Sequence, residues 1–278
     1  MRPVRFSLAR VGLIAGNTVR EAARQRLFNL FVVLALMLVL GARWFRDFSF
    51  GAPELRFLAD CGFGAMAFFG SALTITATAQ LFFSEIENRT ALTLLAKPVW
   101  RAEFIVGKLV GVAGLTLLFC GLLTVLLAAV LWTREGALMQ EFPDNFAQGR
   151  VVSYAMVAGA GAMQWLKLLI LGALVLLVAS FAQTQTFAIV TGFLVLVICH
   201  LQHLALAAYE RSGSLFGMTA SAAIAWMFPN FQVFAWADSL AAADFPGWGQ
   251  VARVVSYGLG YVGLGTALAV FCFRKREI

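Results

Sequence analysis

Six long apolar runs, separated by shorter polar stretches, dominate the hydrophobic pattern of the chain. The runs cover residues 27–45, 57–83, 104–132, 161–182, 187–209 and 251–273. Each is close to or above the roughly 20 residues that an α-helix needs to cross the hydrocarbon core of a bilayer. The pattern predicts an all-α membrane protein in which six transmembrane helices form a single domain over residues 1–278.

Two further segments are partly apolar but do not read as spans. Residues 3–26 place apolar side chains on one face of a helix and charged side chains such as Arg20 on the opposite face. That pattern is typical of a helix that lies in the plane of the membrane interface. Residues 210–250 are crowded with aromatic side chains around Pro229, and their apolar stretch is too short to cross. We expect an in-plane amphipathic helix in the first segment and an external or re-entrant segment in the second.

The polar segment 84–103 carries a dense run of charge between the second and third apolar runs. Its first half can form a short amphipathic helix that places Leu94 and Leu95 on the apolar side. Pro98 must end that helix, because proline lacks a backbone donor and restricts the preceding residue. The third run then opens with the glycine pair of a G-x-x-x-G pattern at 107–111, a signature of close helix packing. We expect a helical hairpin whose tip contacts a partner on one side of the membrane.

The composition supports a membrane location and argues against other classes of protein. Only 13% of the residues are charged, about half the share in a soluble domain, and the mean hydropathy is +0.85. The net charge of +7 does not indicate nucleic-acid binding, because the basic residues flank apolar runs. Membrane lipids with anionic headgroups are the expected partners of these residues. The four cysteines are far apart and have no metal-ligand spacing.

The distribution of basic residues predicts the topology. With the N-terminus inside and six spans, the inner segments hold thirteen Lys and Arg residues and the outer segments hold seven. Inner loops of membrane proteins carry the excess of positive charge. We therefore expect both termini on the cytoplasmic side, together with segment 84–103.

Residues 84–108 also carry a recognisable motif. They read Glu85-Ile-Glu-Asn-Arg-Thr90, then Leu94-Leu-Ala-Lys-Pro98, then Arg101-Ala-Glu-Phe104, then Gly107-Lys108. This wording resembles the first cytoplasmic loop of ABC-2 type transporter permeases, in the branch of copper-enzyme-maturation and gliding-motility permeases. Asn88-Arg89 replaces the commoner basic-glycine pair of that family, and Trp100 stands where serine is common. The sequence Phe-Pro-Asn-Phe-Gln at 228–232 is a second, weaker point of resemblance.

The resemblance implies the permease subunit of an exporter in the bacterial cytoplasmic (inner) membrane. In that family this loop is the coupling helix, which docks into a cleft of a separate ATPase subunit. The permease would form a dimer with a second copy or a sister permease and bind two ATPase subunits. ATP and Mg would be held by the ATPase, and this chain would hold no cofactor, since Gly107-Lys108 lacks the upstream glycine of a Walker A pattern. The residues carried over to the ATPase-binding segment are Glu85, Glu87, Arg89, Thr90, Leu94, Leu95, Pro98 and Arg101. Of these, Arg89 and Arg101 would hold the loop against its own bundle or the partner, and Pro98 would set the turn.

Four polar side chains inside apolar runs are candidates for a second site. Gln164 and Lys167 lie in the fourth run, and His200 and His203 share one face of the fifth. The tight link at 183–186 makes these runs an antiparallel hairpin, so all four residues are expected at similar depth near the outer ends. One hypothesis is that they line an outer vestibule that handles a polar headgroup. The other is that Lys167 snorkels outward while the histidines make interfacial hydrogen bonds. Two histidines supply too few ligands for a metal site.

Two other functions remain open at this point. The chain fits a membrane anchor or mechanical transmitter that uses an ATPase without moving a substrate. It also fits, less well, an intramembrane enzyme, because the spans contain no Ser-His-Asp set, paired aspartates or H-E-x-x-H pattern. No catalytic residue and no metal ligand is therefore assigned.

Overall fold

Helices account for the regular structure of this chain. The computed structural model describes residues 7–41, 54–87, 100–146, 149–211, 219, 222, 227–236 and 247–274. No strand occurs in these ranges. The all-α prediction is confirmed for this part of the chain.

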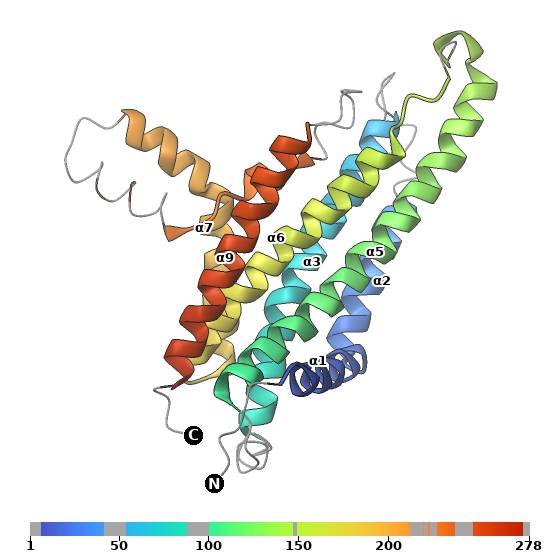
Figure 1. Ribbon diagram of the computed structural model, residues 1–278. Helices are drawn as coiled ribbons and strands as arrows, with labels where there is room; N and C mark the ends of the chain where they lie inside the picture. The colour runs from blue at the N-terminus through green and yellow to red at the C-terminus, as the bar shows by residue number, and fades with distance from the viewer. Residues whose placement is uncertain are drawn as a thin grey trace.

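The long helices form an elongated bundle (Figure 1). They are α2 (Arg26–Gly41), α3 (Glu54–Glu87), α5 (Arg101–Glu141), α6 (Tyr154–Phe181), α7 (Gln185–Arg211) and α9 (Trp248–Arg274). The shorter elements are α1 (Leu8–Ala23) and the 3-10 helices η2 (Pro143–Phe146) and η3 (Phe231–Phe234). In the described ranges α3, α5, α6, α7 and α9 are long and apolar enough to cross a membrane, and α1 with α2 forms a further candidate bent by 68°. The structure thus supports five or six spans where the sequence predicted six.

Two helix ends lie furthest from their predicted positions. α5 continues to residue 141 instead of ending at 132, and α6 begins at residue 154 instead of 161. Charged residues continue α5 because they are paired: Arg134 donates two hydrogen bonds, of 2.5 and 3.1 Å, to the carboxylate of Glu54 in α3. With 41 residues, α5 is about 60 Å long. It therefore extends well beyond the roughly 30 Å hydrocarbon core of a bilayer.

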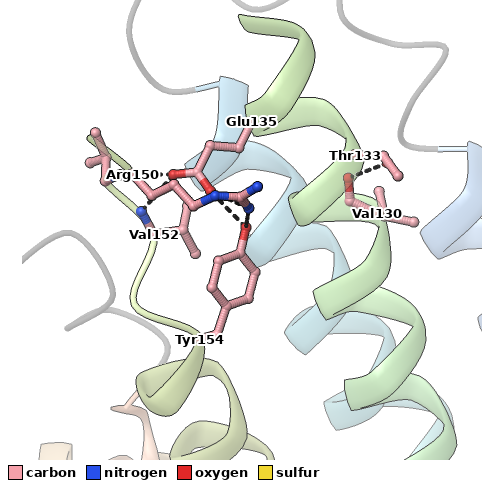
Figure 2. Close-up of polar contacts among 7 residues, drawn as sticks. Val130, Thr133, Glu135, Arg150, Val152 and Tyr154 are labelled. Atoms are coloured by element: carbon pink, nitrogen blue, oxygen red, sulfur yellow. Dashed lines mark hydrogen bonds and ion pairs between the residues drawn. The ribbon is translucent and has the colours of Figure 1, made fainter. Parts of the chain in front are cut away.

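The connection between α5 and α6 is organised around the buried side chain of Glu135. Its carboxylate accepts hydrogen bonds from the N–H groups of Val151 and Val152, at 2.7 and 3.0 Å, and from the hydroxyl of Tyr154 at 2.7 Å (Figure 2). The guanidinium of Arg150 lies 3.5 Å from the same carboxylate. These contacts fix the chain as it turns into α6, because a buried carboxylate is stable only when its oxygens are paired.

The central helix of the bundle is α6 (Figure 1). It contacts α3, α5, α7 and α9, and most of its residues are buried. Its crossing with α9 is close, since a Cβ added at Gly258 of α9 would come within 2.9 Å of the Leu166 side chain. By contrast, α7 and α9 keep many large apolar side chains exposed, as helices that face lipid do.

Helix α1 lies across one end of the bundle and packs on the first turns of α5 (Figure 1). The glycines of the G-x-x-x-G pattern allow this contact. A Cβ added at Gly107 would lie 2.8 Å from Ile14, and one at Gly111 would lie 2.5 Å from Thr18. Small residues permit such close approach of two helices. The glycine pair therefore does pack a helix closely, and its partner is the amphipathic helix at the start of the chain.

Alanine at Gly111 is expected to destabilise the protein by about 1–3 kcal/mol, because the added Cβ pushes α1 away from α5. Alanine at Gly121, in the same helix, is the matched control: an added Cβ there meets no atom within 4 Å. That variant is expected to be neutral or slightly stabilising. Thermal unfolding of both purified variants in detergent measures the difference. Equal stability of the two variants would contradict the close α1–α5 contact.

Candidate functional site

The junction between α3 and α5 contains the segment that the sequence singles out. α3 runs without a break to Glu87, and α5 begins at Arg101, so both ends of segment 84–103 belong to bundle helices. We refer to residues 84–87 and 100–108 as the junction end. The predicted contact residues outside the described ranges are Arg89, Thr90, Leu94, Leu95 and Pro98.

Glu103 ties α1 to α5 at the junction end. It is the third residue of α5 and is 0% exposed. Its Oε1 accepts hydrogen bonds from the N–H of Ser7 and the guanidinium of Arg10, both at 2.7 Å, and its Oε2 accepts one from the N–H of Trp100 at 3.1 Å. The last bond follows the capping-box geometry found at helix N-termini. One carboxylate therefore holds the start of α1 against the start of α5.

A buried ion pair joins α3 to α5 nearby. The Nζ of Lys108 lies 2.6 Å from the Oε1 of Glu85, and both residues are buried. The sequence placed Glu85 in the contact with an ATPase, whereas the structure turns its side chain into the α3–α5 interface. The reason is that α3 stays helical through this residue, so Glu85 shares a face with the buried Phe82 one turn earlier.

Arg101 connects the start of α5 to the end of α9. Its guanidinium donates hydrogen bonds to the carbonyls of Phe273, at 3.1 Å, and Arg274, at 2.7 Å. Carbonyls in the last turn of a helix have no intrahelical donor, and a cation is favourable at this end of the helix dipole. The rings of Phe82, Phe104 and Phe273 pack against one another at the same place, with centroids 5.5–6.0 Å apart.

A fourth polar contact completes the junction end. The hydroxyl of Ser84 in α3 donates a hydrogen bond to Glu21 in α1 at 2.9 Å. The ends of α1, α3, α5 and α9 are thus all linked by polar contacts next to one short segment. A displacement of that segment would reach four helices at once, so this arrangement is suited to transmitting motion.

A second polar group lies in the middle of the bundle. Lys167 is central in α6, about 20 Å from either end of that helix, and is 7% exposed. Its Nζ lies 5.5 Å from the centre of the Phe231 ring, and no acidic side chain of the described residues forms an ion pair with it. A charge at the centre of a membrane helix costs about 2.5–3.5 kcal/mol. A cation–π contact offsets about 0.5–2 kcal/mol of this cost, so Lys167 is only partly compensated.

Gln164 and the two histidines are arranged differently around Lys167. Gln164 lies one turn earlier on the same helix face, is buried, and its Nε2 has no hydrogen-bond partner in the described part of the chain. The His200 ring meets the Phe231 ring at 5.4 Å, edge to face. The Nδ1 atoms of His200 and His203 each lie 3.0 Å from a backbone carbonyl of α7. Phe231 therefore contacts both Lys167 and His200, whereas His203 contacts the backbone.

The position of Lys167 along its helix, and the burial of Gln164 and Lys167, differ from the sequence-based expectation. Lys167 was expected near the outer end of its span, but it lies at the middle of α6 because that helix begins at Tyr154. It does not snorkel outward, since η3 covers its amine through Phe231. Gln164 and Lys167 are both buried, so they do not face an open vestibule in this conformation.

Residues 227–236 reach this group from the segment predicted to be external or re-entrant. η3 packs on α6 and α7, and Phe231 and Phe234 are buried. The N–H of Asn230 donates a hydrogen bond to the hydroxyl of Tyr257 in α9 at 2.9 Å. This part of the segment is therefore inserted among the helices, as a re-entrant segment would be.

The His, Cys, Asp and Glu side chains of the described residues are spread over the bundle. In those ranges no three His, Cys, Asp or Glu side chains come together as a metal ion requires. The nearest approach to a ligand pair, His200 and His203, directs one ring nitrogen of each residue at a backbone carbonyl.

Sequence reasoning missed three residues that organise these two regions. Glu103 and Lys108 were quoted as part of the charged motif but were given no role, and Phe231 was one aromatic residue among many. The available signal for Glu103 was its capping-box spacing after Trp100. The partner of Lys108 is Glu85 in the preceding helix, and the partners of Phe231 lie in α6 and α7. No local sequence pattern specifies these pairings.

The fold and these regions define a class: a multi-pass, α-helical integral membrane protein with a polar junction at one end of its bundle. The chain belongs to the ABC-2 transporter family. Residues 13–209, well over half of the chain, match the family described as ABC-2 family transporter protein. The family resemblance of residues 84–108 is thereby confirmed. No curated protein matches the chain.

Proposed function

We propose that this chain is the permease subunit of an ABC exporter and is driven by a separate ATPase that docks on segment 84–103. Membership of the ABC-2 family supports a permease that works with an ATPase subunit. The observation that carries the proposed coupling is the set of polar contacts at the junction end, where Glu103, Lys108 and Arg101 link the neighbouring helices. ATP-driven closure of the ATPase would push on the segment, and these contacts would pass the motion into the bundle.

Within this proposal the predicted contact residues divide into two groups. Glu85 and Arg101 have partners inside the chain and would transmit motion. The residues that would face the ATPase are Glu87, Arg89, Thr90, Leu94, Leu95 and Pro98. ATP and Mg would be bound by the partner, and two ATPase copies would serve two permeases in a bacterial inner membrane with both termini in the cytoplasm. The exposed apolar faces of α7 and α9 are available to lipid and to the second permease.

Aspartate at both Leu94 and Leu95 is expected to abolish the association with the ATPase, because it places two charges in a contact that apolar side chains would fill. The measurement is co-purification of a Walker-type ATPase from the native membrane, together with ATP hydrolysis by the isolated complex. The matched control is Val151→Asp, an exposed residue on the α5–α6 connection at the other end of α5. This control should retain the ATPase at the wild-type level.

Retention of the ATPase by the double variant would count against docking at this segment. Failure of any ATPase to co-purify with the wild-type chain would remove the proposed mechanism altogether. A complex that hydrolyses ATP in liposomes, but is stimulated by no candidate substrate and moves none, would instead favour a mechanical transmitter.

A further inference from the structure

The two buried lysines of the described bundle differ in their partners. Lys108 lies 2.6 Å from the carboxylate of Glu85. Lys167 is also buried, but the described residues form no ion pair with it, and its amine lies over the Phe231 ring. Ionisable residues inside membrane helices are rare because of their cost, and they mark substrate or ion pathways. Lys167 therefore requires an explanation that Lys108 does not.

Gln164 adds a second donor to the same place. Its side-chain nitrogen is buried, faces the same side of α6 as Lys167, and has no hydrogen-bond partner in the described ranges. An ammonium and an amide N–H are both hydrogen-bond donors, and the ammonium also carries a positive charge, so an acceptor with negative charge complements the two together. Carboxylate and phosphate oxygens have this chemistry, and charge-assisted bonds to them are strong.

We propose that Lys167 and Gln164 form a binding site, in the middle of the helix bundle, for the anionic group of an amphipathic molecule. The surroundings favour such a molecule over a polyanion, because the ring next to the Lys167 amine, Phe231 of η3, is apolar and buried, and the His200 ring lies against Phe231. One positive charge in an apolar setting matches one anionic group attached to an apolar body. The role of this molecule as transported cargo rests on the proposed exporter function, whereas its binding does not.

Access to the site depends on η3. The Phe231 ring lies 5.5 Å from the Lys167 amine and also meets the ring of His200, so an anionic group that pairs with the amine would have to move this ring aside. Binding therefore exchanges a cation–π contact for an ion pair and displaces the Phe231 ring. The segment that carries Phe231 acts as the cover of the site.

The test measures ligand binding to the purified full-length chain, without an ATPase, by native mass spectrometry in non-ionic detergent. The probes are phosphatidylglycerol, palmitate and uncharged diacylglycerol, and the variants are Lys167→Met, Lys167→Gln and Lys167→Arg. Both neutral variants are expected to bind the anionic ligand at least roughly tenfold more weakly, as expected for the loss of a charged hydrogen bond. Lys167→Arg, the matched control, should stay within about threefold of wild type, and diacylglycerol binding should not change.

The outcomes separate the sources of the anionic group. If the neutral variants lose only phosphatidylglycerol binding, the ligand is a membrane phospholipid. If they lose only palmitate binding, it is a free anionic amphiphile. If they lose both, the site recognises the negative charge that the two probes share. Wild-type binding of both anionic probes by the neutral variants overturns the site, as does an equal loss for diacylglycerol. A chain that binds through Lys167 but never associates with an ATPase keeps the site and refutes the exporter. A chain that associates with an ATPase, but whose neutral Lys167 variants bind both anionic probes as the wild type does, keeps the exporter and refutes the site.

Discussion

Replacing Lys108 with methionine is expected to lower the free energy of unfolding by about 3–5 kcal/mol, because it leaves the Glu85 carboxylate buried beside an apolar side chain. The Nζ of Lys108 and the Oε1 of Glu85 are 2.6 Å apart, and both residues lie in the α3–α5 interface. Glu85→Leu is expected to cost a similar amount, because it leaves the Lys108 ammonium buried without its carboxylate. Reversible unfolding in mixed micelles, followed by circular dichroism, measures these differences.

The double variant distinguishes a coupled pair from two independent losses. Lys108→Met combined with Glu85→Leu removes both charges, and its stability is expected to lie within about 1 kcal/mol of the wild type or above it. The exposed pair of Arg56 and Asp60, 3.9 Å apart on α3, is the control. Arg56→Met should change stability by less than about 1 kcal/mol, since solvent screens such a pair. Additive losses in the Lys108–Glu85 cycle would show that the ion pair does not couple α3 to α5.

The same variants connect stability with the proposed mechanism. If the pair transmits motion, the double variant should fold and bind the ATPase but show weaker coupling between ATP hydrolysis and transport. A single variant that removes only one member of the ion pair should, by contrast, lower both the stability of the fold and the coupling between ATP hydrolysis and transport. The comparison therefore separates a role in stability from a role in transmission, which a single substitution cannot do.

The parts of the fold that depend on local pattern were predictable from the sequence. Five of the predicted spans correspond to long helices, because a run of about 20 apolar residues has few other structures open to it. The glycines at 107 and 111 were correctly read as a close-packing surface. Their partner was not predicted, because the pattern describes only one of the two helices in contact.

Helix ends were predicted less well, and this error changed the interpretation of the sites. Polar residues such as Arg134 read as the end of a span, but pairing with Glu54 keeps α5 helical past them. The same kind of error at the start of α6 placed Lys167 closer to the end of its helix than the structure does. Glu85 was expected to pair with a partner protein because it lies in the charged stretch, whereas the bundle supplies Lys108 as its partner. Tertiary pairing decides these positions, and hydropathy does not record it.

Replacing Glu103 with leucine is expected to release α1 from the bundle and to lower stability by about 3–5 kcal/mol. The substitution leaves the Arg10 guanidinium without its carboxylate and removes the acceptor for the N–H groups of Ser7 and Trp100. Glu103→Gln keeps an acceptor oxygen but loses the charge, so its cost should be smaller, about 1–3 kcal/mol. Glu141→Gln, at the exposed far end of the same helix, is the control and should be nearly neutral.

Hydrogen exchange distinguishes this local release from a general loss of structure. Amide protons of α1 should exchange at least roughly tenfold faster in Glu103→Leu than in the wild type, because the docking contact limits local opening. Amide protons in the central α6 should keep their protection, since α6 makes no contact through Glu103. Unchanged exchange in α1 would mean that the glycine contacts at residues 107 and 111 hold the helix without the carboxylate. Faster exchange throughout the bundle would mean that Glu103 supports the whole fold. If only α1 is released, the effect of the variant on ATPase stimulation shows directly whether this helix takes part in coupling.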